Sequence, residues 1–486
     1  MLNKNIFKTP VFIAILLIFN LACKKDKFID DNTAKLAFSS DSVLFDTVFT
    51  TLGSATKYIK IYNNYNQKIK ISSIRLAGGD KSMFSVNIDG KYTSSATDIE
   101  IAAKDSMFIL LKVTVDPNNS NTPLVIKDSL VFNTNTNLQY IKLLAWGQDA
   151  HFIVYDTFIK GLPPFKIVAK EKENITWTND KPYVIYGYAV VDSTGSLTIQ
   201  EGAKIHFYSG SGLWVYKGGS LKVKGSKDKP VVFQGTRLEQ FYKEIPGQWD
   251  RIWLNEGSVN NEINYAEIKN SFIGIQAETL DEFMGNELIL SNTIIKNCSG
   301  AGILARFYKI TAANNVIYNC GQYAVALTKG GYYDFRNCTM ANFWSNSSRQ
   351  SASVVLNNYF IDYNKVVNLY NLENAYFGNC IIYGGIKDEI LLDKAEKADF
   401  KYKFDHCLLK TSLNTSDTLY YVNCILNSDP LFFDINKQNY QLKEKSPAIG
   451  TGSSNILTTL TLSDILGNPR NTAGSVTDLG AYVFKK

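Results

Sequence analysis

The sequence lacks the features that would place it in several large functional classes. No basic block with interleaved aromatic residues occurs, and 51 Lys and Arg against 45 Asp and Glu leave a net charge of only +6 over 486 residues. Nucleic acid is therefore a poor candidate partner. Cysteines never show paired CxxC spacing and only three histidines are present, so no metal site and no cofactor are predicted. Residues 177–486 also contain no Asp-Asp pair and no recognisable lyase signature.

The apolar run near the start is too short to cross a bilayer. Residues 11–19 are all apolar and follow Lys4 and Lys8, which is typical of a signal peptide. The segment ends in a small residue and Cys23, and this resembles the signal of bacterial lipoproteins, in which that Cys is cleaved and acylated. Asn20 stands where that family usually has an aliphatic residue. The resemblance implies lipidation at Cys23; an ordinary secretion signal with an incidental Cys is the alternative.

Short alternating segments separated by turn signals fill residues 35–150. Residues 58–62 alternate, residues 84–88 lead to an Asp-Gly turn, and residues 108–115 end at Asp-Pro. About seven such strands are the count of an immunoglobulin-like sandwich, although the segment contains no Cys. It resembles the immunoglobulin-like modules at the start of many large bacterial surface lipoproteins, and nothing in it looks catalytic.

A repeat organises residues 264–426. Short apolar runs are joined to Asn-Cys or Asn-Gly punctuation with a period of roughly 22 to 27 residues, which indicates a solenoid. The runs are too short and too β-branched for helical repeats, so each unit is predicted to be one coil of a parallel β-helix. Stacking at about 4.8 Å would then align equivalent residues. One inward ladder is expected to contain Ile294, Val316, Thr339, Ile381, Leu408 and Ile425.

The punctuation residues suit sharp corners of such a coil. Asn tolerates left-handed backbone and its amide can bond backbone groups in the turn. His406 replaces one of these Asn residues, so we expect it to have a turn role. Six cysteines between 298 and 424 occupy equivalent repeat positions and are predicted to form a buried stack. A disulfide within the stack is the alternative, because an exported protein can oxidise its thiols.

Both ends of the repeat region resemble right-handed parallel β-helix proteins of the pectin-lyase-like class. Residues 197–205 carry the Leu-Thr-Ile and Gly-x-x-Ile pattern of their opening coils. The Asp-Pro at 429, the Ser-Pro-Ala-Ile at 446 and the Asp-Leu-Gly-Ala-Tyr at 478 follow their closing pattern. The resemblance implies the fold and carries no particular activity. Arg470 and Asp478 are expected to form a structural C-terminal cap.

The predicted fold is all-β, with an N-terminal immunoglobulin-like β-sandwich followed by a right-handed parallel β-helix of about a dozen coils. The expected parts, in chain order, are a lipoprotein signal peptide at 1–22, a tether at 23–34, the sandwich at 35–150, a linker at 151–176 and the β-helix at 177–486.

Candidate site residues lie in the predicted β-helix. Asp250, Arg251 and Arg306 are the candidate catalytic residues, because a lyase needs a cation to neutralise a uronate carboxylate and a hydrolase needs clustered carboxylates. Trp249 and Trp344 are the candidates for stacking on sugar rings, with Trp253 as a third aromatic; at least one of the three is expected in the core. Outward charges that merely keep a long sheet soluble are the alternative.

The leading hypothesis is a non-catalytic lipoprotein of the outer membrane. It would bind glycan or another envelope protein along its outward sheet, with the lipid anchor in the membrane and its side of the membrane left open. The rival hypothesis is a polysaccharide lyase or glycoside hydrolase working in a groove on the β-helix. Three loops are long enough to build the walls of such a groove, at residues 276–287, 343–350 and 387–399.

Overall fold

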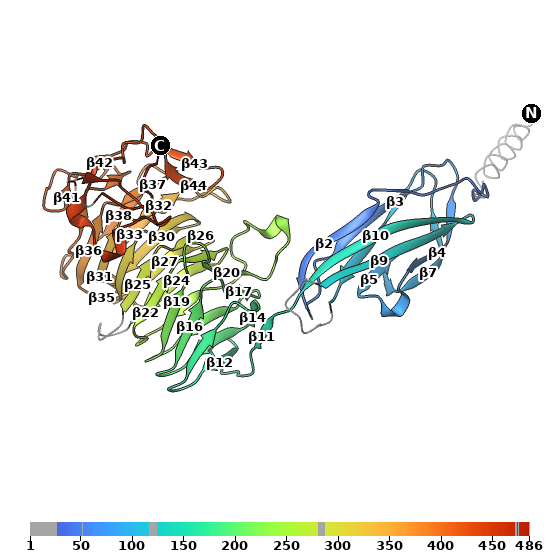
Figure 1. Cartoon of the computed structure of the whole chain (residues 1–486), viewed down its shortest axis with the longest axis horizontal. Helices are drawn as coiled ribbons and strands as arrows, with labels where there is room; N and C mark the ends of the chain where they lie inside the picture. The colour runs from blue at the N-terminus through green and yellow to red at the C-terminus, as the bar shows by residue number, and fades with distance from the viewer. Residues whose placement is uncertain are drawn as a thin grey trace, which may run out of the picture. The chain divides into compact units, whose positions relative to one another are not determined.

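The computed structural model describes residues 27–485 apart from 51, 116–123, 280–286, 472, 473 and 475. The chain divides into two compact units, Met1–Asp149 and Ala150–Lys486 (Figure 1). The predicted signal peptide and Cys23 lie outside the described residues. In the part that is described, no helix is long and apolar enough to cross a membrane.

The first unit is a sandwich of two five-stranded sheets and fits an immunoglobulin-like domain. The sheet orders are β1-β3-β8-β5-β6 and β2-β10-β9-β4-β7. Paired strands run antiparallel except β2, which lies parallel to β10. The strands are β1 (Ala37–Phe38), β2 (Ser42–Phe49), β3 (Lys57–Tyr62), β4 (Ile69–Leu76), β5 (Phe84–Ile88), β6 (Lys91–Thr93), β7 (Ser95–Ile101), β8 (Ser106–Val113), β9 (Leu124–Thr134) and β10 (Asn137–Gln148).

Inward-facing Ile, Val, Leu and Phe side chains from both sheets form the core of the sandwich. Burial of this apolar area is the main stabilising contribution. The described part of the unit holds ten strands where about seven were predicted. Short edge strands explain the difference, because two or three residues, as in β1 and β6, are too few to show alternation.

The second unit is a β-helix in which each coil contributes strands to parallel sheets (Figure 1). The β11 sheet contains β11 (His151–Val154), β14 (Tyr183–Tyr186), β17 (Lys204–Phe207), β20 (Val231–Gly235), β23 (Ala266–Lys269), β26 (Ile294–Cys298), β29 (Val316–Cys320), β32 (Thr339–Asn342), β37 (Ile381–Gly384), β40 (Leu408–Leu409) and β42 (Ile425–Leu426). Eleven strands in this sheet agree with the expected dozen coils.

Two further parallel sheets complete the coils. The β12 sheet contains β12 (Phe165–Ala169), β15 (Tyr188–Val191), β18 (Gly212–Val215), β21 (Ile252–Leu254), β24 (Ile273–Glu278), β27 (Ala301–Arg306), β30 (Tyr323–Thr328), β33 (Val354–Asn357) and β38 (Ile390–Asp393). The β13 sheet contains β13 (Asn174–Trp177), β16 (Ser196–Gln200), β19 (Ser220–Lys224), β22 (Asn261–Asn264), β25 (Glu287–Ser291), β28 (Lys309–Ala313), β31 (Gly331–Arg336), β36 (Leu372–Gly378), β39 (Lys403–Asp405) and β41 (Tyr421–Val422).

Residues 151–176, predicted as a linker, form the first coil of the β-helix. Each of β11, β12 and β13 begins one of the parallel sheets, and His151 of β11 is paired with Tyr183 of β14. The Pro-Pro dipeptide at 163–164 lies in the turn before β12 instead of ending a domain. Proline suits that place because it breaks a strand without breaking the coil.

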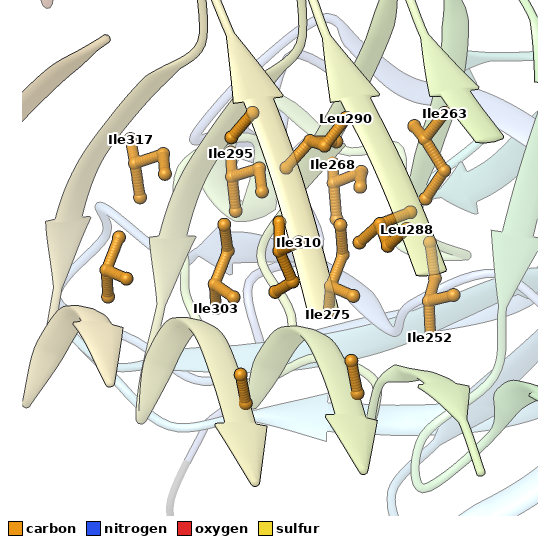
Figure 2. Packing of buried hydrophobic residues seen from close by; sticks show 14 of the residues in the cluster. Ile252, Ile263, Ile268, Ile275, Leu288, Leu290, Ile295, Ile303, Ile310 and Ile317 are labelled. Atoms are coloured by element: carbon orange, nitrogen blue, oxygen red, sulfur yellow. The ribbon is translucent and has the colours of Figure 1, made fainter. Parts of the chain in front are cut away.

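The residues of the predicted repeat ladder are aligned as expected, but their side chains lie on the outer face of the sheet instead of the inner one. Ile294, Val316 and Thr339 are aligned on neighbouring strands, and Ile381, Leu408 and Ile425 continue the row. The inward ladder is instead the next residue of each strand: Ile268, Ile295, Ile317, Met340, Ile382 and Leu409. Figure 2 shows the first three of these side chains in the core. Between β29 and β40 both rows are buried, and all their residues except Thr339 are apolar. Alternation therefore does not reveal which row points inward.

The outer face of the β11 sheet is covered by the C-terminal segment. Val316, Ile381 and Leu408 pack against Leu442, Leu479 and other apolar residues of that segment. The segment holds β43 (Phe432–Asp434), β44 (Asn439–Leu442), β45 (Gly452–Ser453) and β46 (Val476–Thr477), with 3-10 turns at Ser454–Ile456 and Thr459–Thr461. The predicted C-terminal cap is therefore structural, but it covers the side of the coils.

Arg470 anchors this cover. It is only 4% exposed, and its guanidinium donates hydrogen bonds to the Asn314 side-chain oxygen at 3.1 Å and to the Gly480 carbonyl at 2.8 Å. Burial lowers the pKa of Arg470 to about 10. The Asp478 carboxylate accepts bonds from the backbone amides of Gly450 and Phe484, each at 2.8 Å. Both residues that the closing pattern singled out therefore hold the segment in place.

Left-handed corners repeat up the β-helix as the Asn pattern predicted. Asn292, Asn314, Asn337, Asn379 and Asn423 have φ between +47° and +54°. The amide of Asn314 donates to the side-chain oxygen of Asn292 at 3.2 Å, so the corners are also linked along the axis. His406 occupies the same corner with φ +51° and contacts the Asn423 amide at 3.1 Å. Its turn role is confirmed.

The cysteines form no disulfide and lie in two stacks instead of one. Cys298 and Cys320 are aligned on neighbouring strands, at the ends of β26 and β29. Cys338, Cys380, Cys407 and Cys424 directly precede strands of the same sheet, at the other corner of the coil. All six are free thiols, and each is buried except Cys424, which is half-buried. A small thiol fits a corner that faces the interior, where it bonds a backbone carbonyl, as Cys407 does with Phe377 at 3.1 Å.

Candidate functional site

A groove of about 610 Å³ lies on the outward face of the β12 sheet. Its floor is a row of apolar side chains aligned across four neighbouring strands: Leu304, Ala326, Val355 and Leu391. Because side chains alternate along a strand, the intervening Leu327 and Leu356 point inward and belong to the core. The strands thus present an apolar floor outward while they fill the interior.

A hairpin forms one wall of the groove. Strands β34 (Tyr359–Ile361) and β35 (Val367–Leu369) pair antiparallel, and Tyr359, Phe360 and Ile361 line the groove. The turn is built by Asp362, whose carboxylate accepts the backbone amides of Asn364 and Val366 at 2.9 Å each. An Asp/Asn turn between apolar runs was the signal in the sequence that could have predicted this hairpin.

The carboxylates of the groove are already engaged by donors. Glu278 accepts the indole N–H of Trp253 at 2.6 Å and the Gln276 amide at 3.0 Å, and it forms an ion pair with Arg306 at 3.3 Å. Asp393 accepts the Asn357 amide at 2.9 Å and the Tyr359 hydroxyl at 2.9 Å. The hydrogen bond to Asp393 raises the pKa of Tyr359. The phenol therefore keeps its proton at neutral pH.

Lys329 is the cation of the groove without a carboxylate partner among the described residues. It follows β30 with φ +59° and is half-buried. Its ammonium lies 4.7 Å from the ring centroid of Tyr370 and 5.5 Å from that of Phe360. Aromatic faces stabilise a cation without neutralising it, so this wall keeps its attraction for an anion. Within the described residues, no group of three His, Cys, Asp or Glu side chains could hold a metal ion.

The structure does not bring Arg251 and Arg306 together as a cationic pair. Arg251 forms an ion pair with the adjacent Asp250 at 2.8 Å and also donates to Gln276. The two arginines lie in different rows of the β12 sheet. Arg251 precedes Ile252, which is aligned with Ile275 and Ile303, whereas Arg306 ends β27 and is aligned with Glu278. Arg306 lines the groove, and Asp250 and Arg251 do not. Asp250 instead accepts a hydrogen bond from Tyr188.

The two predicted sugar-stacking residues lie outside the groove. Trp249 is 1% exposed, stacks on Phe207 with centroids 4.3 Å apart and donates its indole N–H to the Lys269 carbonyl at 2.8 Å. It is therefore a core residue. Trp344 is half-buried, donates to the Ser347 hydroxyl at 2.9 Å and does not line the groove.

Trp253 does not line the groove but lies on the row of residues that leads to its floor. It stacks on Trp214 with centroids 5.0 Å apart and an interplanar angle of 18°. Trp214, Trp253, Gln276 and Leu304 are aligned on successive strands, so one outward row runs from this stack into the groove. With β18 and β38 as its ends, the row crosses seven strands, about 29 Å at the usual strand spacing.

Comparisons with known families agree with this geometry. The family described as a right handed beta helix region matches residues 245–402, and the pectate-lyase like beta helix domain matches residues 169–274. Residues 169–402 form a right-handed, pectate-lyase-like β-helix. The predicted all-β class and right-handed β-helix are thereby confirmed. The coils that carry the groove lie within this right-handed β-helix.

No curated protein matches the sequence. Among solved structures, the chain is similar to the Agl-KA catalytic domain at 8% identity, over 72% of this chain and 79% of that one, with a TM-score of 0.25. It is also similar to the ASH / PapD-like domain of human CEP192 at 8% identity, over 24% of this chain and 87% of that one, with a TM-score of 0.17. Such low TM-scores assign no activity to the chain.

Proposed function

We propose that the outward face of the β12 sheet binds an acidic polysaccharide, with the groove beside the β34–β35 hairpin as the principal site. The observation that carries the proposal is Lys329, a cation held on aromatic rings and without a carboxylate partner in the described chain. A uronate carboxylate would pair with Lys329 and Arg306. The apolar floor and the aromatic wall would take the C–H faces of the sugar rings.

Binding without cleavage is favoured by the state of the acid and base candidates. Glu278 and Asp393 are both occupied by hydrogen-bond donors, and a phenol with a raised pKa is a poor general base at neutral pH. The lipoprotein-like sequence that ends at Cys23 supports a place in the cell envelope, anchored to the outer membrane by acyl chains. The protein would then hold polysaccharide at the envelope.

A polysaccharide lyase acting in the same groove is the second candidate. Lys329 and Arg306 line one groove, and a lyase needs a base for the α-proton and a cation for the uronate carboxylate. In this scheme Lys329, as the neutral amine, would remove the α-proton and Arg306 would neutralise the carboxylate. The electron pair of the broken C–H bond would form the double bond of the unsaturated product while the neighbouring glycosidic C–O bond breaks and its oxygen leaves with the other half of the chain.

Affinity electrophoresis in gels with polygalacturonate, alginate or a neutral galactan tests the proposal. We expect retardation by the acidic polymers alone, and Lys329→Gln should weaken it about fivefold to tenfold because a partly buried ion pair is lost. Lys172→Gln, which removes a lysine with a side chain 82% exposed on an early turn, is the matched control. Equal retardation of Lys329→Gln and the native protein would exclude the groove.

The same mixtures are followed by ultraviolet absorbance for unsaturated sugar products. Products that form with the native protein and disappear in Lys329→Gln would establish the lyase instead. Binding without products would support the proposed holding role.

A further inference from the structure

The two sheets of the N-terminal sandwich carry different charge. The strands β1, β3, β5, β6 and β8 contain no Asp or Glu and four lysines, Lys57, Lys60, Lys91 and Lys112. The strands of the other sheet contain four acidic residues, Asp46, Asp98, Glu100 and Asp128, and four basic ones, Lys70, Arg75, Lys127 and Lys142. Lys70 is paired there with Asp98 at 2.7 Å, and Lys57 of the first sheet reaches Asp46 at 3.9 Å. The first sheet therefore presents positive charge that its own strands do not neutralise.

The outward side of this positive sheet also carries exposed aromatic and apolar side chains. Tyr58 is 64% exposed, Tyr92 62% and Phe108 51%, and Leu110 lies between them at 38%. The alternate positions of the same strands, such as Ile59 and Ile109, are fully buried in the sandwich core. Core packing therefore explains only the inner rows and leaves the outer aromatic residues without a structural role.

These side chains form ordered rows. Tyr58, Leu110, Asn87 and Tyr92 are consecutive partners across β3, β8, β5 and β6, a row of about 14 Å at the usual strand spacing. Phe108 lies in the adjacent row, and its ring meets that of Tyr58 edge-on with centroids 5.4 Å apart. The result is an aromatic platform on a sheet face.

Each outward lysine lies over a ring of the platform. The Lys60 ammonium is 5.2 Å from the Phe108 centroid, and the Lys112 ammonium is 5.9 Å from that of Tyr92. Neither lysine forms an ion pair with a described carboxylate. A ligand on this face would meet an aromatic surface and a free positive charge at the same place.

We propose that this face of the sandwich is a second binding site for acidic polysaccharide, separate from the groove of the β-helix. Pyranose rings stack on Tyr58, Tyr92 and Phe108, and their carboxylates or sulfates pair with Lys60 and Lys112. A protein partner fits less well, because lysine and Asn87 interrupt the apolar residues, whereas protein interfaces have an apolar centre depleted of lysine. Two sites on one chain would raise the avidity for a long polymer.

The test uses the full-length protein in the Lys329→Gln background, so that binding in the groove is reduced first. Tyr58→Ala with Phe108→Ala removes the platform, and Lys60→Gln with Lys112→Gln removes the charge. The matched control is Leu138→Ala with Tyr140→Ala, which removes side chains 56% and 57% exposed on the opposite sheet. Thermal unfolding of each variant confirms that these exposed positions leave the sandwich folded.

We expect the platform variant and the charge variant each to weaken binding of polygalacturonate or chondroitin sulfate about fivefold, and the control to leave it unchanged. Comparison of the two polymers distinguishes carboxylate from sulfate recognition. The proposal is overturned if the platform variant binds like its parent. It is also overturned if poly-glutamate binds as tightly as the polysaccharides and is lost in the same variants, because the site would then recognise an acidic protein. A failure of the groove proposal would be seen separately, as equal binding by Lys329→Gln and the native protein. The comparison of the platform variant with its parent would still test the sandwich site.

Discussion

Arg349 and Glu389 form a buried two-point ion pair in the β-helix. The two guanidinium nitrogens lie 2.7 Å and 2.9 Å from the two carboxylate oxygens, with side chains 3% and 0% exposed. Glu389 also accepts the hydroxyl of Ser353 at 2.6 Å and the backbone amide of Ile386 at 3.0 Å. The pair fastens the loop after β32 to the start of β38, the strand that brings Leu391 and Asp393 to the groove.

Removal of one partner of this pair should be costly. Arg349→Ala leaves the Glu389 carboxylate buried without its cation, and we expect a loss of about 3 to 5 kcal/mol in the free energy of unfolding. Replacing both residues by methionine should recover much of that loss, because two apolar groups leave no unpaired charge. Urea unfolding followed by circular dichroism measures both. A loss below about 1 kcal/mol in Arg349→Ala would contradict the buried pair.

His206 should make stability fall in mild acid. Burial lowers its pKa from 6.5 to about 4, so the unfolded chain binds a proton between these values while the folded chain does not. The stabilising contribution is complete above pH 6.5 and is lost as the pH falls towards 4, by up to about 3 kcal/mol.

The measurement is the free energy of unfolding in urea between pH 7.5 and about pH 4, for the native protein and for His206→Gln. The slope should flatten in His206→Gln and remain in the control His151→Gln, which changes a partly exposed histidine that contacts Asp180. Identical slopes of the unfolding free energy against pH in all three proteins would show that His206 binds its proton equally well in the folded and the unfolded chain.

The corner at His406 should accept asparagine and reject a β-branched residue. With φ +51° the backbone is left-handed, a conformation that Asn adopts and that valine strains. His406→Asn is expected within about 0.5 kcal/mol of the native protein, and His406→Val should lose roughly 1 to 2 kcal/mol. Thermal and urea unfolding compare the two variants. Equal stability of both would mean that the corner has no left-handed requirement.

Arg470 should control the attachment of the C-terminal cover. Its buried guanidinium links Asn314 of the coils to the Gly480 carbonyl, so Arg470→Ala leaves these acceptors unsatisfied and should cost about 2 to 4 kcal/mol. We expect faster chymotryptic cleavage within residues 430–485, read by mass spectrometry. Lys437→Ala, at a side chain 84% exposed in the same segment, is the control. Unchanged cleavage would remove Arg470 from this role.

Several parts of the site were predictable and others were not. The Asn corners and the register of the repeat follow from local preferences, so they were correctly placed from sequence. Arg306, a candidate catalytic residue, lines the groove, and its catalytic role stays a prediction. Trp249 is the tryptophan in the core, as was expected of at least one of the three, but the local sequence did not show which one. Lys329 and the β34–β35 hairpin were missed, since their importance depends on neighbours such as Tyr370 and Asp393 that lie on other coils.

The amino-acid sequence by itself determined that the chain is all-β, that its second part winds into a repeating parallel coil, and which residues stack above one another; the right-handedness was implied by the family resemblance. These properties depend on period and turn chemistry, which are local along the chain. Only the tertiary structure decided which apolar row faces the interior, because the C-terminal segment buries the other face of the same sheet. It also decided which charges remain unpaired. Arg251 is paired with Asp250 and Lys329 has no carboxylate partner among the described residues, and both facts depend on distances between side chains that sequence spacing does not give.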